Sequence, residues 1–228
     1  MNEDQTVGSF EYFRLLNHRI YQNPNRIVYS NTLELVAKIV FYAARLREKG
    51  IHKGRPEEIK RCTVMAFSWL MAFANRVGMT DIGIQAYRHF DKCPYCTGLP
   101  CSCGSGKKTG RILFEYQGQS LLVDEFQTHI SKVYPSNTLE RSGNHLVAEA
   151  AELMEAYMTY RRNEGVTTLA HVIEEFCDVT GHLVSIAHCD GFSLSHETRV
   201  VFQNGCPGCG LPECGCDYVE IVGSKVHV

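Results

Sequence analysis

The sequence predicts an all-α fold built from two tandem helical repeats, each of which ends in a four-cysteine metal knuckle. A four-cysteine pattern, C-x2-C-x4-C-x-C, ends the first repeat at 93–103 and recurs with identical spacing at 206–216. Apolar residues in both halves recur at the helical period of about 3.6 residues. Strand patterns are confined to 112–123 and 218–228, where we expect minor β-hairpins.

Length, charge and hydropathy bound the class of protein. The 228 residues suffice for one large domain or two small ones, and an apolar fraction of 44% can supply a core. A formal net charge of −2 provides no basic field for a nucleic-acid partner, so we disfavour one. No apolar run approaches the roughly 20 residues that span a bilayer. The acidic, polar N-terminus does not resemble a secretory signal, so we expect a cytoplasmic protein without a membrane partner.

The eleven cysteines admit two interpretations. A secreted disulfide scaffold is one, but no signal is seen, the count is odd, and eight of the cysteines cluster in two short segments. Metal binding by thiolates in a reducing cytosol fits the pattern better. The other three cysteines lie in apolar helical patterns, and we expect all three in the core: Cys62, Cys177 and Cys189.

The cysteine spacing also aligns the two halves. The 113-residue offset that carries Cys93 onto Cys206 pairs 11–103 with 124–216 without a gap. Identities outside the cysteines are sparse, so a duplication is inferred from the shared spacing and the shared helical pattern. Convergent reuse of a cysteine motif is the alternative. We therefore predict a first repeat at 1–103, a linker with a hairpin at 104–122, and a second repeat at 123–228.

Each repeat is expected to contain four helices. In the first repeat they are expected at 9–21, 32–49, 56–77 and 80–91. In the second, a helix at 124–133 is ended by Pro135, and Asn144 is a suitable N-cap for a helix that runs to about residue 162.

The last two helices of the second repeat are also bounded by capping residues. Thr167 or Thr168 can cap a helix that runs to about residue 189. Asp190 and Gly191 end it, and Ser193 caps a short final helix that leads to the second group of cysteines.

Four acidic residues form two pairs in the second repeat. Glu149 and Glu152 are three residues apart on one predicted helix, and Glu175 and Asp178 are three apart on the next. Residues at i and i+3 share a helix face, and both pairs border the apolar stripe, so packing of the two stripes would bring the carboxylates together. Clustered anions require compensation, and oxygen ligands suit Mg²⁺ or Mn²⁺.

The 113-residue offset tests whether these acids lie on a solvated face, which is the alternative interpretation. All four counterparts in the first repeat are apolar, which predicts that the positions face the interior: Val36, Ile39, Cys62 and Met65. The first repeat would then be an inactive partner. Its aromatic residues Trp69 and Tyr42 have the size to stack on a nucleotide base, but helical spacing favours the core for both.

The acidic pairs carry a family resemblance. Glu149-x2-Glu152 followed by Glu175-x2-Asp178 resembles the signature of the MazG-like all-α nucleoside triphosphate pyrophosphohydrolases, over roughly residues 123–204. The resemblance implies Mg²⁺-dependent cleavage of a (d)NTP to the monophosphate and pyrophosphate, and assembly from paired bundles. By this resemblance, one chain here would supply both bundles and pack them as a pseudo-dimeric helix bundle, and a homodimer of two such pseudo-dimers is left open.

The expected mechanism assigns a role to each acid. Glu149, Glu152, Glu175 and Asp178 would hold one or two Mg²⁺ ions, which activate a water for attack on phosphorus. Glu152 is favoured as the carboxylate that orients or deprotonates that water. His182 follows Asp178 by one turn and would contact phosphate or an outer-sphere water, unless it is a plain surface histidine.

Each four-cysteine group can close a tetrahedral zinc site without an open position. We expect one structural Zn²⁺ in the first knuckle and one in the second, with an arrangement swapped across the halves as a variant and an iron–sulfur cluster as the alternative. The ligands are Cys93, Cys96, Cys101 and Cys103 in the first knuckle and Cys206, Cys209, Cys214 and Cys216 in the second.

Two competing functions remain open. One is a non-catalytic scaffold or sensor that binds nucleotide and metal without cleavage. The other is a zinc-knuckle nucleic-acid adaptor that uses Lys107, Lys108 and Arg111.

Overall fold

The computed structural model describes residues 6–21, 31–103, 111–119 and 121–216, and within them the fold is helical. The first half contains α1 (Phe10–Tyr21), α3 (Thr32–Arg45), α4 (Pro56–Arg76) and α5 (Ile82–Phe90). The second half contains α6 (Val123–Val133), α7 (Leu139–Arg162), α8 (Val166–Asp190) and α9 (Leu194–Phe202). The all-α prediction is confirmed. The helix expected at 32–49 is divided, since α3 continues into a π-helical segment, η2 (Leu46–Ile51).

The starts of α7 and α8 differ from the prediction. Thr138, not Asn144, caps α7, because its side chain accepts a hydrogen bond from the Arg141 amide at 3.2 Å. Asn144 lies inside the helix and accepts from Arg47 Nε at 2.6 Å. α8 begins directly after Gly165, and no side-chain oxygen caps it.

The end of α8 and the start of α9 follow the prediction. Gly191 ends α8 in the left-handed region at φ 78°, a conformation that favours glycine. Ser193 then caps α9 by accepting from the His196 amide at 3.0 Å.

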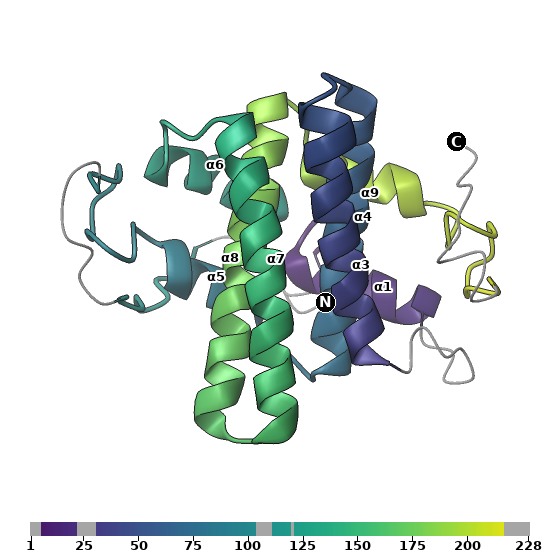
Figure 1. Cartoon of the computed structure of the whole chain (residues 1–228), viewed down its shortest axis with the longest axis horizontal. Coiled ribbons are helices and arrows are strands. Elements are labelled where there is room, and N and C mark those ends of the chain that lie inside the picture. Colours follow the sequence, from purple (N-terminus) through teal and green to yellow (C-terminus); the bar gives the residue numbers. More distant parts are fainter. Residues whose placement is uncertain (1–5, 22–30, 104–110, 120, 217–228) are drawn as a thin grey trace.

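Two long helix pairs form the centre of the molecule. α7 packs along α8 and α3 along α4, and the pairs meet through contacts of α3 with α7 and of α4 with α8 (Figure 1). The shorter helices surround them, and the two knuckles lie on opposite sides of the bundle. Aromatic side chains from both halves share one core, as where Phe10 meets Phe126 edge-on with ring centroids 5.5 Å apart. None of the described helices has the length and apolar character that a bilayer span requires.

The two halves exchange matching backbone contacts near the start of each. The Phe10 amide donates to the Leu121 carbonyl at 3.2 Å, and the Val123 amide donates to the Gly8 carbonyl at 3.0 Å. The two donors, Phe10 and Val123, are 113 residues apart, and so are the two acceptors, Gly8 and Leu121.

The knuckles are attached in the same reciprocal way. The Cys101 amide donates to the Val133 carbonyl of α6 at 2.7 Å. The Cys214 amide donates to the Ile20 carbonyl of α1, also at 2.7 Å. These bonds again correspond under the 113-residue offset, so each knuckle is anchored to a helix of the opposite half.

The predicted hairpin at 112–123 is wrong. Residues 111–119 are irregular, and the described part of the chain contains no strand, only an isolated antiparallel bridge between Ser9 and Leu122. The segment bonds to the first half instead of to itself, because the Ile112 amide donates to the Pro94 carbonyl at 3.0 Å and the Phe114 amide to the Arg88 carbonyl at 2.7 Å. The other expected hairpin, at 218–228, lies outside the described residues.

The structure shows the burial of the three cysteines outside the knuckles and of two aromatic residues of the first half. Cys62 and Cys177 are buried as predicted, but Cys189 is exposed at the end of α8, so the prediction of a core position for Cys189 is wrong. Tyr42 and Trp69 are core residues, and Trp69 stacks on Tyr21 with ring centroids 5.3 Å apart.

Candidate functional site

Three of the four predicted acids converge between α7 and α8. Glu149 on α7 and Glu175 and Asp178 on α8 each present a carboxylate oxygen within 4.8 Å of the others. Glu175 and Asp178 are only 5% and 7% exposed, and Glu149 is half-buried. The i, i+3 spacing on α8 and the close packing of the two helices produce this group, which we call the carboxylate group.

Glu152 lies at the rim of the carboxylate group and is not a member of it. Its side chain is exposed, although its counterpart Ile39 is fully buried, so the inward position that the offset indicated does not hold for this residue. Its charge nevertheless contributes to raising the pKa of both Glu149 and Glu175, which places Glu152 close to them.

Within the carboxylate group, Glu149 and Glu175 lack enough nearby positive charge to offset their burial. Burial, followed by the charges of neighbouring acids, raises the pKa of Glu149 to about 8 and that of Glu175 to about 7. The Glu175 Oε2 atom is buried and has no hydrogen-bond partner among the described residues. A buried carboxylate oxygen without a donor is costly, and a bound cation would remove that cost.

Two basic residues that sequence reasoning did not assign to the site contact Asp178. His89 of α5, only 2% exposed, places Nε2 3.1 Å from Asp178 Oδ1. Arg111 donates from Nη2 to Asp178 Oδ2 at 2.6 Å and pairs with Glu174 through Nη1. Burial opposes ionisation of Asp178, but these hydrogen bonds and charges outweigh it and lower the pKa of Asp178.

A signal for His89 was present in the sequence. The 113-residue offset pairs His89 with Phe202, which is buried on α9. A polar residue opposite a buried apolar one is the same signal that singled out the acids. Arg111 has no such signal, because it lies outside the ungapped pairing of 11–103 with 124–216.

His182 lies beside the carboxylate group, where the sequence places it. Its Nε2 is 3.9 Å from Glu149 Oε1, and its ring stacks on His145 with centroids 5.4 Å apart and an interplanar angle of 7°. Burial lowers the pKa of His182 to about 4, so the ring is neutral near pH 7. His145, Glu149 and His182 form a second group whose ligand atoms lie within 4.8 Å of one another.

The corresponding region of the first half is neutralised by its own side chains. Glu58 pairs with Arg45 and, at 3.0 Å, with Arg61. Although burial opposes ionisation, the hydrogen bonds from these arginines lower the pKa of Glu58 to about 2. The first-half counterparts of the acids are fully buried at Val36, Ile39 and Cys62 and partly buried at Met65.

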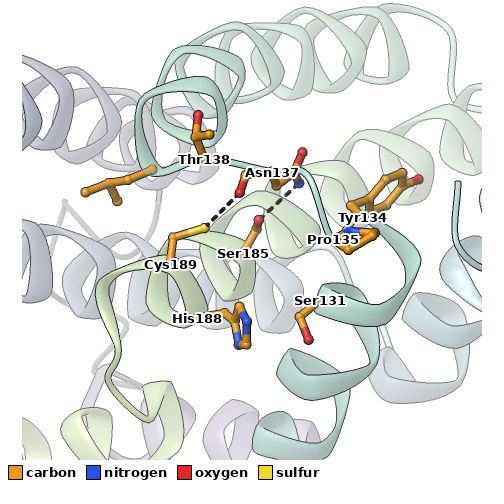
Figure 2. A pocket seen from close by; sticks show the side chains of 9 residues that line it. Ser131, Tyr134, Pro135, Asn137, Thr138, Ser185, His188 and Cys189 are labelled. Atoms are coloured by element: carbon orange, nitrogen blue, oxygen red, sulfur yellow. Dashed lines mark hydrogen bonds between the residues drawn. The ribbon is translucent and has the colours of Figure 1, made fainter. Parts of the chain in front are cut away.

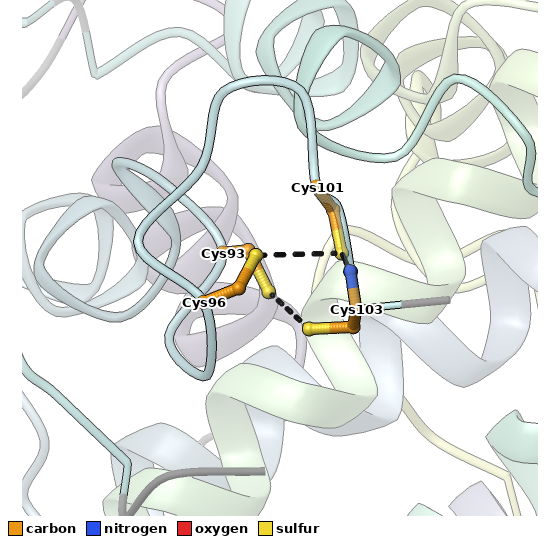
Figure 3. A group of neighbouring side chains, drawn as sticks. All are labelled: Cys93, Cys96, Cys101 and Cys103. Atoms are coloured by element: carbon orange, nitrogen blue, oxygen red, sulfur yellow. Dashed lines mark hydrogen bonds between the residues drawn. The ribbon is translucent and has the colours of Figure 1, made fainter. Parts of the chain in front are cut away.

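Each knuckle gathers its four sulfur atoms within 4.8 Å of one another. In the first knuckle, Sγ of Cys93 and Cys103 are 3.5 Å apart and those of Cys96 and Cys101 are 3.9 Å apart (Figure 3). Tetrahedral zinc with Zn–S bonds of about 2.3 Å places its sulfurs about 3.8 Å apart. A disulfide bond would require about 2.05 Å, and all eleven cysteines are free. Both groups can therefore hold a metal ion.

Backbone amides favour the thiolate form of one cysteine in each knuckle. The Ser102 amide donates to Cys96 Sγ and the Gly215 amide to Cys209 Sγ, both at 3.3 Å. In the first knuckle, the amides of Ser102 and Gly98 lower the pKa of Cys96 to about 6. In the second, burial opposes the shift, but the amide bonds still lower the pKa of Cys209. Thiolate is the form that binds metal.

A pocket of about 370 Å³ lies away from the carboxylate group, where α6 and α8 end and α7 begins (Figure 2). None of the four acids lines it. On one wall, Asn137 Nδ2 donates to Ser185 Oγ at 3.1 Å. The exposed thiol of Cys189 donates to the Asn137 carbonyl at 3.6 Å. The pocket is therefore separate from the site that the sequence predicts.

Comparison of the chain with protein-family models, with curated proteins and with solved structures finds no match.

Proposed function

We propose that this protein is a Mg²⁺-dependent nucleoside triphosphate pyrophosphohydrolase. The observation that carries the proposal is the carboxylate group, in which the pKa values of Glu149 and Glu175 are raised and a buried Glu175 oxygen has no donor among the described residues. A site with only oxygen ligands suits Mg²⁺ or Mn²⁺. The reaction class, cleavage of a (d)NTP to the monophosphate and pyrophosphate, comes from the resemblance of the two acidic pairs to the MazG-like signature.

The proposed mechanism divides the four acids into two roles. Glu149, Glu175 and Asp178 would hold the cation, which when bound offsets phosphate charge and makes a coordinated water more acidic. Glu152 would orient or deprotonate the attacking water, a role that suits an exposed carboxylate at the rim. Phosphate contact by His182 remains part of the proposal, with the ring acting in its neutral form.

We further propose that the chain is a tandem duplication of a MazG-like repeat, with one active site and one inactive counterpart. The reciprocal hydrogen bonds related by the 113-residue offset support a pseudo-two-fold arrangement. The paired charges around Glu58 support the loss of a cation site in the first half, because that acid is already compensated.

We propose one structural Zn²⁺ in each knuckle. The sulfur separations and the amide donors support four-thiolate sites, and a closed set of four ligands leaves no position for a substrate. Iron–sulfur clusters use the same ligand set, and metal analysis of the purified protein separates the two.

Product analysis after incubation with a panel of NTPs and dNTPs and Mg²⁺ tests the proposed function. Monophosphate with pyrophosphate is the expected result. Tight nucleotide binding without turnover would indicate the scaffold or sensor instead. Neither binding nor turnover would contradict both and leave the nucleic-acid adaptor. Two of the three basic residues of that adaptor, Lys107 and Lys108, lie outside the described residues, while Arg111 is engaged with acids.

The variant Glu152→Gln tests the division of roles. We expect it to abolish turnover, by at least about 100-fold, while Mg²⁺ binding and thermal stability stay as in the wild type. Glu155→Gln is the matched control, since Glu155 is also exposed on α7 but belongs to neither group of metal-binding side chains described above. Unchanged turnover in Glu152→Gln would remove Glu152 from the mechanism.

A further inference from the structure

We infer that the first knuckle positions Arg111 at the carboxylate group through Tyr95, so that this knuckle, and not the second, sets the affinity of the site for cation and nucleotide. The inference rests on the proposed function, because it assigns a regulator to the same site. Tyr95 would be a positioning residue and Arg111 a substrate-binding residue, and neither has a role in the mechanism proposed above.

The contact between Tyr95 and Arg111 joins the knuckle to the site. Tyr95 lies between the ligands Cys93 and Cys96. Arg111 Nη2 donates to Tyr95 Oη at 3.0 Å, and the guanidinium carbon lies 5.5 Å from the centroid of the Tyr95 ring. The same Nη2 donates to Asp178 Oδ2 at 2.6 Å. One guanidinium nitrogen therefore bridges the knuckle and the buried acid.

The backbone around Arg111 is held by the same loop. The Ile112 amide donates to the carbonyl of Pro94, which directly precedes Tyr95. Arg111 is thus fixed to the first knuckle by a side-chain hydrogen bond, by a cation–π contact with the tyrosine ring and by a neighbouring backbone hydrogen bond. A change in the shape of the knuckle loop, such as loss of its metal, would release all three together.

The second knuckle provides an internal control. Under the 113-residue offset, Tyr95 corresponds to Gly208 and Asp178 to Met65. The second knuckle therefore has neither the aromatic ring nor the facing carboxylate. Each knuckle is anchored to the opposite half by an equivalent backbone hydrogen bond of 2.7 Å. Both knuckles therefore anchor the fold, but only the first can position Arg111.

The position of Arg111 has opposite consequences for a cation and for a nucleotide. Its charge already compensates Asp178, so a divalent cation at the carboxylate group competes with Arg111. A polyphosphate, in contrast, offers the guanidinium acceptor oxygens in a geometry that arginine binds well. Releasing Arg111 should therefore tighten cation binding and weaken nucleotide binding. A merely structural role for Tyr95 would weaken both.

The test uses the full chain with zinc in its knuckles, Mn²⁺ as the cation probe and a cleavable NTP. Electron paramagnetic resonance of free Mn²⁺ gives the cation affinity, and steady-state kinetics give KM and kcat. For Tyr95→Gly, which installs the residue of the second knuckle, we expect Mn²⁺ to bind about 3- to 10-fold tighter and KM to rise by a similar factor. kcat should change less. Arg111→Gln should show the same pair of shifts.

Disruption of each knuckle completes the comparison. Cys96→Ser should reproduce the shifts of Tyr95→Gly, whereas Cys209→Ser should lower thermal stability but keep the wild-type Mn²⁺ affinity. The inference would be overturned by equal effects of the two cysteine variants. It would also be overturned if Tyr95→Gly changed Mn²⁺ affinity and nucleotide affinity in the same direction.

The variant Asp178→Asn separates failure of the proposed cation site from failure of the inference about Tyr95 and Arg111. Wild-type Mn²⁺ binding in Asp178→Asn would overturn the cation site and this inference together. Weakened binding there, with wild-type behaviour of Tyr95→Gly, would overturn the inference alone.

Discussion

At the scale of single residues, the two halves differ in how charge is compensated. Glu58 in the first half is paired with two arginines, and its pKa lies far below the ordinary value. Glu149 and Glu175 in the second half have raised pKa values because burial and like charges outweigh the contribution of Arg111. The uncompensated acids of the second half destabilise the fold, and sites that keep such charge are frequently functional.

This imbalance predicts a pH dependence of stability in protein without bound Mg²⁺. Between pH 6.5 and 8, Glu149 and Glu175 hold protons in the folded state that they have lost in the unfolded state, so the free energy of unfolding should fall as pH rises. The window starts at pH 6.5 because below it His182, whose pKa is lowered, acts in the opposite direction. We expect a decline on the order of 1 kcal/mol in urea unfolding.

Excess Mg²⁺ should abolish this decline, since the cation binds the deprotonated acids. Glu149→Gln is the matched variant and should flatten the profile in the absence of Mg²⁺. A stability that rises through this pH window in metal-free wild-type protein would contradict the raised pKa values.

At the scale of elements, apolar periodicity predicted each α-helix that the described residues contain, and local capping chemistry predicted only some of the boundaries. Gly191 ends α8 and Ser193 caps the start of α9, both as expected. Asn144 was a plausible cap by type, but the turn after Pro135 already provides Thr138, and α7 starts there. Propensity identifies residues that can cap a helix; the path of the preceding chain decides which one does.

The start of α7 can be tested by a pair of variants. Thr138→Ala should lower the free energy of unfolding by about 1 kcal/mol, because the Arg141 amide loses its acceptor. Asn144→Ala should cost less than about 0.5 kcal/mol, since it removes only an exposed contact with Arg47. Denaturant unfolding of both variants measures the difference, and the reverse order would place the start of the helix at Asn144.

At the scale of the whole molecule, long-range contacts limited what the sequence could predict. The acids were found because their spacing is local and their counterparts are apolar. His89 and Arg111 reach Asp178 from α5 and from the segment before α6, and no local pattern brings them together. The exposure of Glu152 likewise depends on how α7 is rotated in the bundle, which a spacing of three residues does not fix.

The crossed anchoring of the knuckles predicts that zinc stabilises the whole chain. Metal analysis should find two Zn²⁺ per chain. A thiol-competent chelator should lower the melting temperature by about 10 °C or more in a single transition, because each knuckle anchors the opposite half. Mass spectrometry of the intact protein and calorimetry provide the two measurements. Two separate transitions after zinc removal would contradict the crossed arrangement.

The bridge between Ser9 and Leu122 has a consequence for symmetry. The two positions are related by the same 113-residue offset, so Ser9 contacts the residue that corresponds to itself. In a dimer of identical subunits, a residue on the two-fold axis meets its own copy in this way. Such a dimer cannot alter one of its sites without altering the other, because one gene encodes both. Under the proposed duplication, both bundles lie in a single chain and each can mutate independently. That freedom is what the proposed asymmetric pair, with one acidic and one apolar site, requires.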